Sequence, residues 1–222
     1  MTLPSKIPLR SSRAVMTNPN VLVALGLTAG YAALGAAVMA KKTTRLDRAL
    51  RRLQRHPATG PRRAVATGVK RIALPECQLI AAAAIAIAMR RARVPGGGAV
   101  MGAAVAVFLA DRASKRFTDR RRPPGYHGNK SYESFPSGHT AATTALTLTV
   151  ARVLEREGLA EPWIARLVAA ALIGIVGESR LVLDEHWPTD VLAGGLLGAA
   201  VSDFALAADG LQNVFAGRAR SR

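Results

Sequence analysis

The sequence is poor in cysteine and in aromatic residues, and both shortages limit what the protein can be. Cys77 is the only cysteine among 222 residues, which excludes an intrachain disulfide and a metal site built from several thiolates. Aromatic residues make up 5% of the chain, whereas 50% of all residues are hydrophobic, with Ala, Val and Leu dominant. Small aliphatic side chains let helices pack closely, as they do in membranes. The composition therefore favours a bundle of membrane helices.

Acidic residues are also scarce. The chain has 14 Asp and Glu against 31 Lys and Arg, a formal net charge of +17. Such an excess is typical of proteins that bind nucleic acid or an anionic membrane surface. The basic residues cluster between apolar stretches, and the interleaved aromatic residues or basic helix expected of a nucleic-acid-binding domain are not apparent. The charge therefore favours anionic lipid as a partner, and no nucleic acid is expected.

The hydrophobic residues gather in six stretches that approach the length of a membrane span, which is about 20 mostly apolar residues. These stretches are Val21–Ala40, Leu79–Met89 with an extension back through Leu74, Ala99–Ala110, Thr140–Leu154, Ile164–Val182 and Val191–Ala207. Several are short or carry polar residues, which membrane helices tolerate where they face the interior of a bundle. The predicted fold is all-α: a polytopic membrane helical bundle with about six transmembrane helices, formed by a single domain over residues 1–222.

The segment Lys41–Arg71, between the first two apolar stretches, is dense in Arg and Lys. Within it, Leu46, Leu50 and Leu53 recur at helical spacing among arginines. This pattern predicts a short helix that lies on anionic lipid headgroups at the membrane interface. A solvated basic loop is the alternative.

Three polar clusters lie at the ends of the apolar stretches. They are Lys115 followed by Arg122-Pro123, then Pro136-Ser137-Gly138-His139, and finally Ser179-Arg180 followed by His186 and Asp190. Ser137 is a good N-cap for the helix that follows it, and the N–H groups at such a helix start form an anion site. Gly138 would let an anion approach the backbone closely. Lys115 and two arginines add fixed positive charge that suits phosphate oxygens.

Two histidines remain for the reaction itself. The pKa of imidazole lies near neutrality, so one histidine can be neutral while the other is protonated. A neutral His186 could attack phosphorus, and a protonated His139 could donate to the leaving oxygen, which predicts a bell-shaped dependence of activity on pH. Asp190 could fix the tautomer of His186. Each residue also has a simpler interpretation, since Asp190 could cap a helix and His186 could be an interfacial residue beside Trp187.

Together the three clusters resemble the signature of the type 2 phosphatidic acid phosphatase superfamily, which includes lipid phosphate phosphatases and vanadium haloperoxidases. The resemblance covers residues 110–200, with Lys115 and Arg122-Pro123 in the place of the first motif. The second motif corresponds to Pro136–His139 and the third to Ser179–Asp190, with no departure at the defining positions. The rest of the chain is similar only in its helical character.

The resemblance implies a role for each motif residue. His186 would attack the phosphorus atom and form a phosphohistidine, with Asp190 orienting it. His139 would protonate the departing oxygen and then activate water. The residues implied to hold the phosphoryl oxygens are Lys115, Arg122, Ser137, Gly138 and Arg180. Members of the superfamily need no metal for this chemistry, so neither a metal nor another cofactor is expected.

The leading hypothesis is therefore an integral membrane lipid phosphatase. Candidate substrates are phosphatidate, phosphatidylglycerol phosphate, a polyprenyl phosphate or pyrophosphate, and a prenyl-linked sugar phosphate. A head-group phosphotransferase would share the phosphohistidine. The spanning segments oppose a vanadium haloperoxidase, because those enzymes are soluble. The complete set of motif residues opposes a non-catalytic scaffold that binds anionic lipid through Lys41–Arg71.

The distribution of basic residues also bears on topology. The active-site loops and Lys41–Arg71 fall on the same side of a six-span bundle, and that side carries more Lys and Arg. By the positive-inside rule this favours an active site at the cytoplasmic face of the cell membrane, although superfamily members often have it on the external face. The sequence gives no indication of the oligomeric state.

Overall fold

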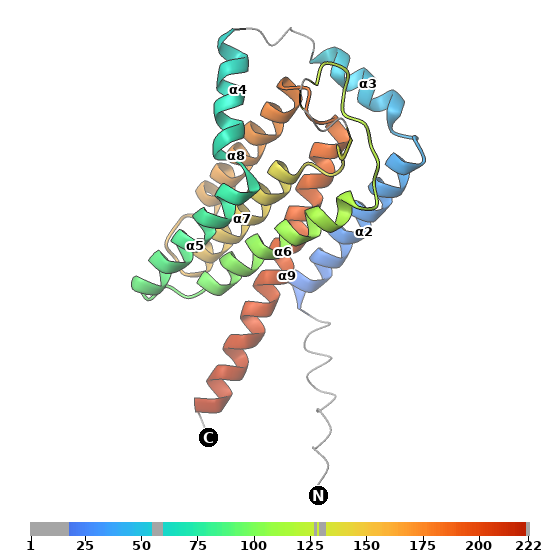
Figure 1. The fold of residues 1–222 in the computed structure, drawn as a ribbon. Coiled ribbons are helices and arrows are strands. Elements are labelled where there is room, and N and C mark those ends of the chain that lie inside the picture. The colour runs from blue at the N-terminus through green and yellow to red at the C-terminus, as the bar shows by residue number, and fades with distance from the viewer. Residues whose placement is uncertain (1–17, 55–59, 127, 129–131, 221–222) are drawn as a thin grey trace, which may run out of the picture.

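The computed structural model describes residues 18–54, 60–126, 128 and 132–220, and for residues 211–220 it describes the backbone alone. Over this part of the chain the fold is all-α, as predicted, with eight helices (Figure 1). They are α2 (Pro19–Met39), α3 (Thr44–Leu53), α4 (Pro61–Ile72), α5 (Pro75–Arg91), α6 (Gly97–Lys115), α7 (Gly138–Arg156), α8 (Pro162–Val182) and α9 (Pro188–Arg220). The predicted domain over residues 1–222 extends beyond the described residues at both ends.

Local chemistry explains where these helices start and stop. Five of them begin with proline, whose fixed φ and missing N–H suit the first helical turn; they are α2, α4, α5, α8 and α9. Lys115 and Arg180 lie in the last turns of α6 and α8, where a cation interacts favourably with the helix dipole. Two of the predicted phosphate-binding residues therefore also stabilise the ends of the helices that carry them.

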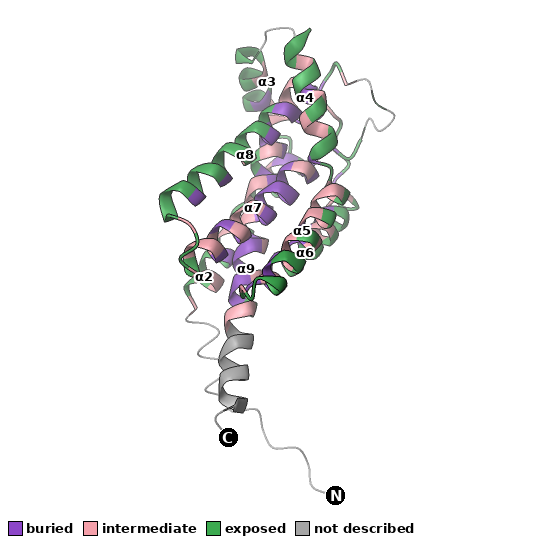
Figure 2. Ribbon diagram, turned by 90° about the vertical axis from the view of Figure 1, so that its left-hand side faces the viewer, coloured by how far each residue is buried: buried purple, intermediate pink, exposed green. Residues whose placement is uncertain are grey.

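The helix α7 lies at the centre of the bundle, against α6, α8 and α9. Figure 2 shows that buried residues concentrate on α7 and on the adjoining part of α9. Glycines on α9 permit this close approach. A Cβ atom at Gly194 would lie 2.5 Å from the Ser137 carbonyl oxygen, and one at Gly198 would lie 2.4 Å from the Ala141 carbonyl oxygen. Small residues four apart allow the same close packing in membrane bundles.

All six predicted stretches form helices, but length and composition alone qualify fewer of them as spans. Among the described residues, α2, α6 and the Pro188–Gly210 part of α9 are long and apolar enough to cross a membrane. The helices α4 and α5, which meet at an angle of 55°, make a fourth candidate if they count as one bent span. The helix α7 is rich in threonine, and α8 carries Arg166, Glu178 and Arg180, so their polar residues lower their apolar character.

The basic segment Lys41–Arg71 contains the helices α3 and α4, and residues 55–59 between them lie outside the described part of the chain. The predicted helix is present as α3, so a loop is excluded over Thr44–Leu53. Its leucines are exposed, with 82% of Leu53 accessible, whereas Asp47 is 1% accessible. The helix therefore contacts the rest of the protein through a carboxylate and leaves its leucines facing outward.

Candidate active site

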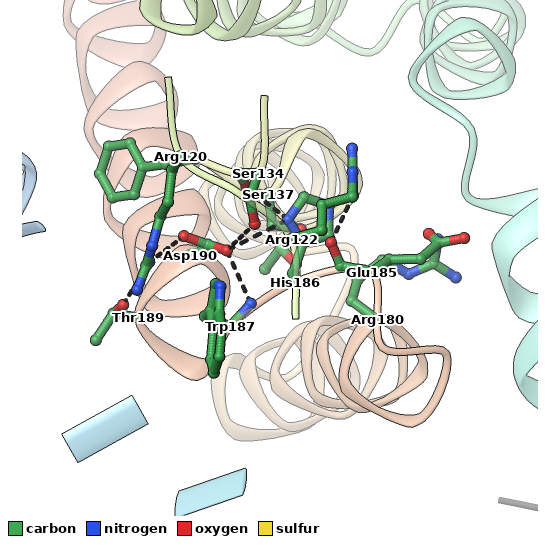
Figure 3. A network of polar contacts seen from close by, with 12 residues as sticks. Arg120, Arg122, Ser134, Ser137, Arg180, Glu185, His186, Trp187, Thr189 and Asp190 are labelled. Atoms are coloured by element: carbon green, nitrogen blue, oxygen red, sulfur yellow. Dashed lines mark hydrogen bonds and ion pairs between the residues drawn. The ribbon is translucent and has the colours of Figure 1, made fainter. Parts of the chain in front are cut away.

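The three polar clusters, which are far apart in the sequence, meet at one end of the bundle. Lys115 ends α6, Ser137 precedes α7, Arg180 lies near the end of α8, and Asp190 lies in the first turn of α9. The Ser137 N–H donates to the Asp190 carbonyl oxygen at 3.0 Å, which joins the second cluster to the third. In Figure 3 the labelled residues of these segments surround His186.

The orientation of His186 is set by its hydrogen bonds. Its Nδ1 atom lies 2.7 Å from the Ser134 carbonyl oxygen, and the ring is 4% accessible. Because a carbonyl oxygen can only accept, Nδ1 must carry the proton, and Nε2 is then the unprotonated nitrogen that can accept a hydrogen bond. This Nε2 atom lies 3.4 Å from Nη1 of Arg122. The geometry thus presents a nucleophilic nitrogen to a cation that can hold a phosphoryl oxygen.

Asp190 lies close to His186 without a direct hydrogen bond to it. The distance from Asp190 Oδ2 to His186 Nδ1 is 3.7 Å. Instead, this oxygen accepts the Ser134 hydroxyl and the Trp187 backbone N–H, the latter at 2.8 Å. Asp190 therefore caps the start of α9, as a capping-box residue does, and also keeps a negative charge beside the imidazole. Ser134 is the residue that contacts both, and no motif in the sequence marks it.

The start of α7 has the features of an anion site. Ser137 is fully buried, and its Oγ atom lies 3.0 Å from Thr140 Oγ1. A Cβ atom at position 138 would lie 2.8 and 2.9 Å from the two carboxylate oxygens of Asp111, so the close approach requires the glycine. Lys115 Nζ lies 2.7 Å from Asp111 Oδ2. The predicted lysine is therefore in place, held by a carboxylate that the sequence analysis did not single out.

Arg180 is completely buried and also has a carboxylate partner. Its Nη1 donates to Glu185 Oε2 at 2.9 Å, and Lys70 of α4 pairs with the other oxygen of Glu185. Arg122 donates to the Glu185 carbonyl oxygen. Sequence reasoning missed both Glu185 and Lys70. Glu185 directly precedes His186, but its role depends on the direction that the chain takes after the end of α8. Lys70 is one of many cations in its segment, so the sequence does not distinguish it from the others.

The second histidine, His139, lies on the first turn of α7, ahead of the apolar stretch. Burial lowers its pKa from 6.5 to about 2, with Arg180, His186, Lys115 and Lys70 contributing in the same direction. Its Nε2 atom is buried and has no hydrogen-bond partner among the described residues. His139 is therefore neutral in the free site, so the proton that the predicted mechanism requires must arrive with the substrate.

The pKa of His186 is lowered as well. Burial is the largest cause, and Arg122 and Lys115 act in the same direction, while the Asp190 carboxylate opposes them. A lowered pKa keeps the imidazole neutral near pH 7, the form that a nucleophile needs. Among the described residues, no group of three or more His, Cys, Asp or Glu is arranged to hold a metal ion.

Arg120 is a further residue that the sequence analysis did not assign. It precedes the predicted Arg122 by two positions in a run of three arginines, so the sequence alone could not separate their roles. Its guanidinium contacts the Asp190 carboxylate on one side and Asp47 of α3 on the other. The carboxylate beside His186 is thus connected to the basic segment that precedes the second span.

Comparison with known proteins gives consistent results. The pattern of the PAP2 superfamily matches residues 98–209, half of the chain. A decaprenylphosphoryl-5-phosphoribose phosphatase from Mycobacterium tuberculosis is 35% identical over 146 residues, which cover 63% of this chain and 71% of that protein. A lipid A 1-phosphatase from Porphyromonas gingivalis is 38% identical over 109 residues, 48% of this chain and 21% of that protein.

A solved structure has the same fold. A transmembrane PAP2 type phosphatidylglycerolphosphate phosphatase from Bacillus subtilis superimposes with a TM-score of 0.66 at 23% identity, covering 84% of this chain and 96% of that one. The predicted polytopic membrane bundle is therefore confirmed. The predicted motif core, residues 110–200, lies within the matched residues 98–209.

Proposed function

We propose that this chain, which belongs to the PAP2 superfamily and is a multi-pass membrane phosphatase of lipid phosphates, removes the terminal phosphate of a polyprenyl-linked phosphosugar. In this proposal His186 is the nucleophile. The substrate class rests on the similarity to the mycobacterial decaprenylphosphoryl-5-phosphoribose phosphatase, which extends over most of that protein. The nucleophile rests on one observation: His186 Nδ1 donates to the Ser134 carbonyl, so the unprotonated nitrogen is Nε2, which faces Arg122 at 3.4 Å.

The phosphoryl group would bind between the start of α7 and the cations around it. The N–H groups of the first turn after Ser137 favour an anion there, because they have no partner within the helix. Lys115 and Arg180 would exchange their carboxylate partners for phosphoryl oxygens. Charge-assisted hydrogen bonds of this kind each contribute about 1.5–3 kcal/mol. Three cations directed at one phosphoryl group would stabilise the charge that develops during transfer.

In the first step, the lone pair of His186 Nε2 forms the N–P bond while the bond from phosphorus to the sugar oxygen breaks. That oxygen keeps the electron pair and takes a proton from His139. Since His139 is neutral in the free site, the substrate supplies this proton: a phosphomonoester has a second pKa of about 6 and can bind as the monoanion. The bound negative charge also offsets the cations that lower the pKa of His139.

In the second step, a water molecule attacks the phosphohistidine and gives its proton to His139. The N–P bond breaks, its electron pair returns to Nε2, and inorganic phosphate takes the proton back from His139 and leaves as the monoanion. The Asp190 carboxylate stabilises the positive charge that the imidazole carries between the two steps. The nucleophile and the acid–base group thus keep separate roles, each on its own helix end.

Phosphate release by the detergent-purified protein tests this proposal. The panel contains a polyprenylphosphoryl phosphosugar, phosphatidylglycerol phosphate, phosphatidate and a polyprenyl diphosphate, with His186→Ala and Glu76→Gln as variants. We expect the phosphosugar lipid to be hydrolysed fastest, His186→Ala to be inactive, and Glu76→Gln, which lies in an exposed ion pair with Arg112, to remain active. Faster hydrolysis of another lipid would overturn the substrate class, and retained activity of His186→Ala would overturn the nucleophile.

We also propose that the active site lies at the cytoplasmic face, on the basis of charge. The helices α3 and α4 lie at the same end of the bundle as the catalytic loops (Figure 1) and carry most of the basic segment Lys41–Arg71. These cations suit the anionic lipids of that leaflet. Labelling by a membrane-impermeant thiol reagent, with Cys77→Ser and a new cysteine at the exposed Arg48, decides between the faces. Labelling of intact cells would place the site outside.

A further inference from the structure

A chain of charged side chains connects α3 to the carboxylate beside His186. Asp47 is 1% accessible and Asp190 is completely buried, and the Arg120 guanidinium lies between them. Its Nη2 pairs with Asp47 Oδ2, and its Nη1 pairs with Asp190 Oδ1. Figure 3 shows Arg120 on the opposite side of Asp190 from His186. The Asp190 carboxylate is thus held on both oxygens: Arg120 binds Oδ1, and the Ser134 hydroxyl and the Trp187 N–H donate to Oδ2.

Asp47 also binds the start of the helix that carries Asp190. Its Oδ1 accepts the Thr189 backbone N–H at 3.0 Å, and its Oδ2 accepts the Thr189 hydroxyl at 3.0 Å. The Thr189 hydroxyl lies 2.8 Å from Arg120 Nη1 as well. The N–H groups of a first helical turn have no partner within their own helix, so a residue of α3 caps α9 from outside. This explains why the buried residue of α3 is its aspartate.

The net charge of Asp47, Arg120 and Asp190 affects the imidazole of His186. Paired with Arg120 alone, Asp190 would form a neutral unit, whereas Asp47 makes the group of three net negative. Besides Asp190, the charges that act most on His186 are those of Arg122, from the loop between α6 and α7, and of Lys115, from α6, and His139 of α7 interacts with it as well. The carboxylate of α3 therefore adds negative charge on the Asp190 side of His186, whereas the carboxylates of Asp111 and Glu185 lie against Lys115 and Arg180.

We propose that Asp47 and Arg120 are positioning residues for phosphoryl transfer, and that α3 is part of the active site through them. They hold Asp190 at the start of α9 and keep the net charge beside His186 negative while the imidazole becomes positively charged. The proposal rests on the proposed role of His186 as nucleophile. It assigns a function in the reaction to the basic segment, in addition to its expected contact with lipid.

A purely structural role for Asp47 would be to dock α3, and the chain offers a matched control for that role. Arg51, on the same helix, pairs with Asp184 through two bonds of 3.0 and 2.8 Å. Asp184→Asn therefore weakens the docking of α3 by the same chemical change as Asp47→Asn. Asp184 has a φ of 54°, a conformation that asparagine adopts readily. If docking alone matters, the two variants will behave alike.

The experiment measures kcat, KM and the pH profile of kcat/KM for the purified full-length variants. Asp47→Asn should lower kcat at least about tenfold, as loss of a supporting contact does in other sites, with KM within about twofold. Removing a negative charge near His186 lowers its pKa, so the acid limb of the profile should move to lower pH. Asp184→Asn should change kcat less than about twofold and leave that limb in place.

Arg120→Gln gives a test of opposite sign. It removes the positive charge between the two carboxylates, so the acid limb should move to higher pH. The double variant Asp47→Asn/Arg120→Gln restores the net charge of the group, so its acid limb should return toward that of the wild type while kcat stays low. If Asp47→Asn does not fold, the direction of the shift in Arg120→Gln decides. Unshifted limbs in the folded variants, or equal kcat for Asp47→Asn and Asp184→Asn, would overturn the proposal even if His186→Ala is inactive.

Discussion

Both ends of the bundle contain an arginine that pairs with a buried carboxylate, but only one end contains a nucleophile. At the end away from His186, Arg152 of α7 pairs with Asp203 of α9, and the Thr149 hydroxyl donates to the Ser202 hydroxyl at 2.9 Å. At the catalytic end, Arg180 pairs with Glu185 in a similar way. The two pairs at the far end join α7 to α9, and each of these polar side chains has a hydrogen-bond partner, which is the usual state of buried polar groups.

At the catalytic end, some buried polar atoms in the described part of the chain lack a hydrogen-bond partner. Three buried side-chain atoms have no hydrogen-bond partner among the described residues, and two of them, Asp111 Oδ1 and His139 Nε2, lie beside the predicted phosphate site. The third is Thr144 Oγ1, farther along α7. A buried unpaired polar atom costs about 1–3 kcal/mol, so it is retained where it serves a purpose. Charge pairs alone therefore do not identify a site, whereas buried unpaired atoms beside an unprotonated imidazole nitrogen do.

The largest effect that separates the two ends should come from arginine-to-lysine changes. Arg180→Lys keeps the positive charge but loses the planar fork that matches phosphoryl oxygens, so kcat/KM should fall about 100-fold. Arg152→Lys makes the same change at the far end, where the pair serves packing, and kcat/KM should stay within about twofold. Steady-state phosphate release by both purified variants measures this. Equal losses would mean that the far pair also acts on catalysis.

Glycine-to-alanine changes should separate the ends by a smaller margin. Gly138→Ala places a methyl group 2.8 Å from the Asp111 carboxylate, which would move the partner of Lys115, and kcat/KM should fall about tenfold. Gly198→Ala places a methyl group 2.4 Å from the Ala141 carbonyl oxygen, and such overpacking costs about 1–3 kcal/mol of stability. Thermal unfolding and kinetics on the same samples should show a kinetic loss in Gly138→Ala and mainly a stability loss in Gly198→Ala. The reverse pattern would contradict the assignment.

The comparison of the two ends also shows how far the sequence could predict the structure. Apolar stretches of nearly full span length predicted six helices, because hydrophobic periodicity and length are local properties. The motif residues were predicted because their spacing at helix ends is a property of the sequence too. The number of apolar spans was less predictable, since α7 places threonines and α8 places Arg180 inside the bundle, where tertiary packing rather than composition decides.

The contacts that complete the site could not be predicted for a different reason. Asp47 and Arg120 lie 73 positions apart, and Ser134 lies 52 positions from His186. Their roles depend on how α3 and the loop before α7 cross the start of α9, which no local pattern encodes. The leucine pattern correctly predicted a helix at α3, but it drew attention to the apolar face, whereas the buried contact is made by the aspartate.

The smallest effect should be a difference in how pH acts on stability at the two ends. Both described histidines lie at the catalytic end, and burial lowers the pKa of each below its ordinary value of 6.5. Above pH 6.5 neither the folded nor the unfolded state binds the proton, so stability is at its full value. Below pH 6.5 the unfolded state binds protons that the folded state excludes, and stability falls as the pH falls toward the folded pKa.

Each buried histidine should remove up to about 1.4 kcal/mol per pH unit in that range. His139→Gln removes one titrating group, so its melting temperature should fall less steeply than that of the wild type between about pH 6.5 and about pH 5. Ser202→Ala, which removes a hydrogen bond at the far end, should lower the melting temperature by the same amount at every pH, because no titrating histidine contacts it. A His139→Gln slope equal to that of the wild type would mean that the folded protein binds a proton on His139 as readily as the unfolded chain does, and the substrate would then not need to supply the proton for the leaving oxygen.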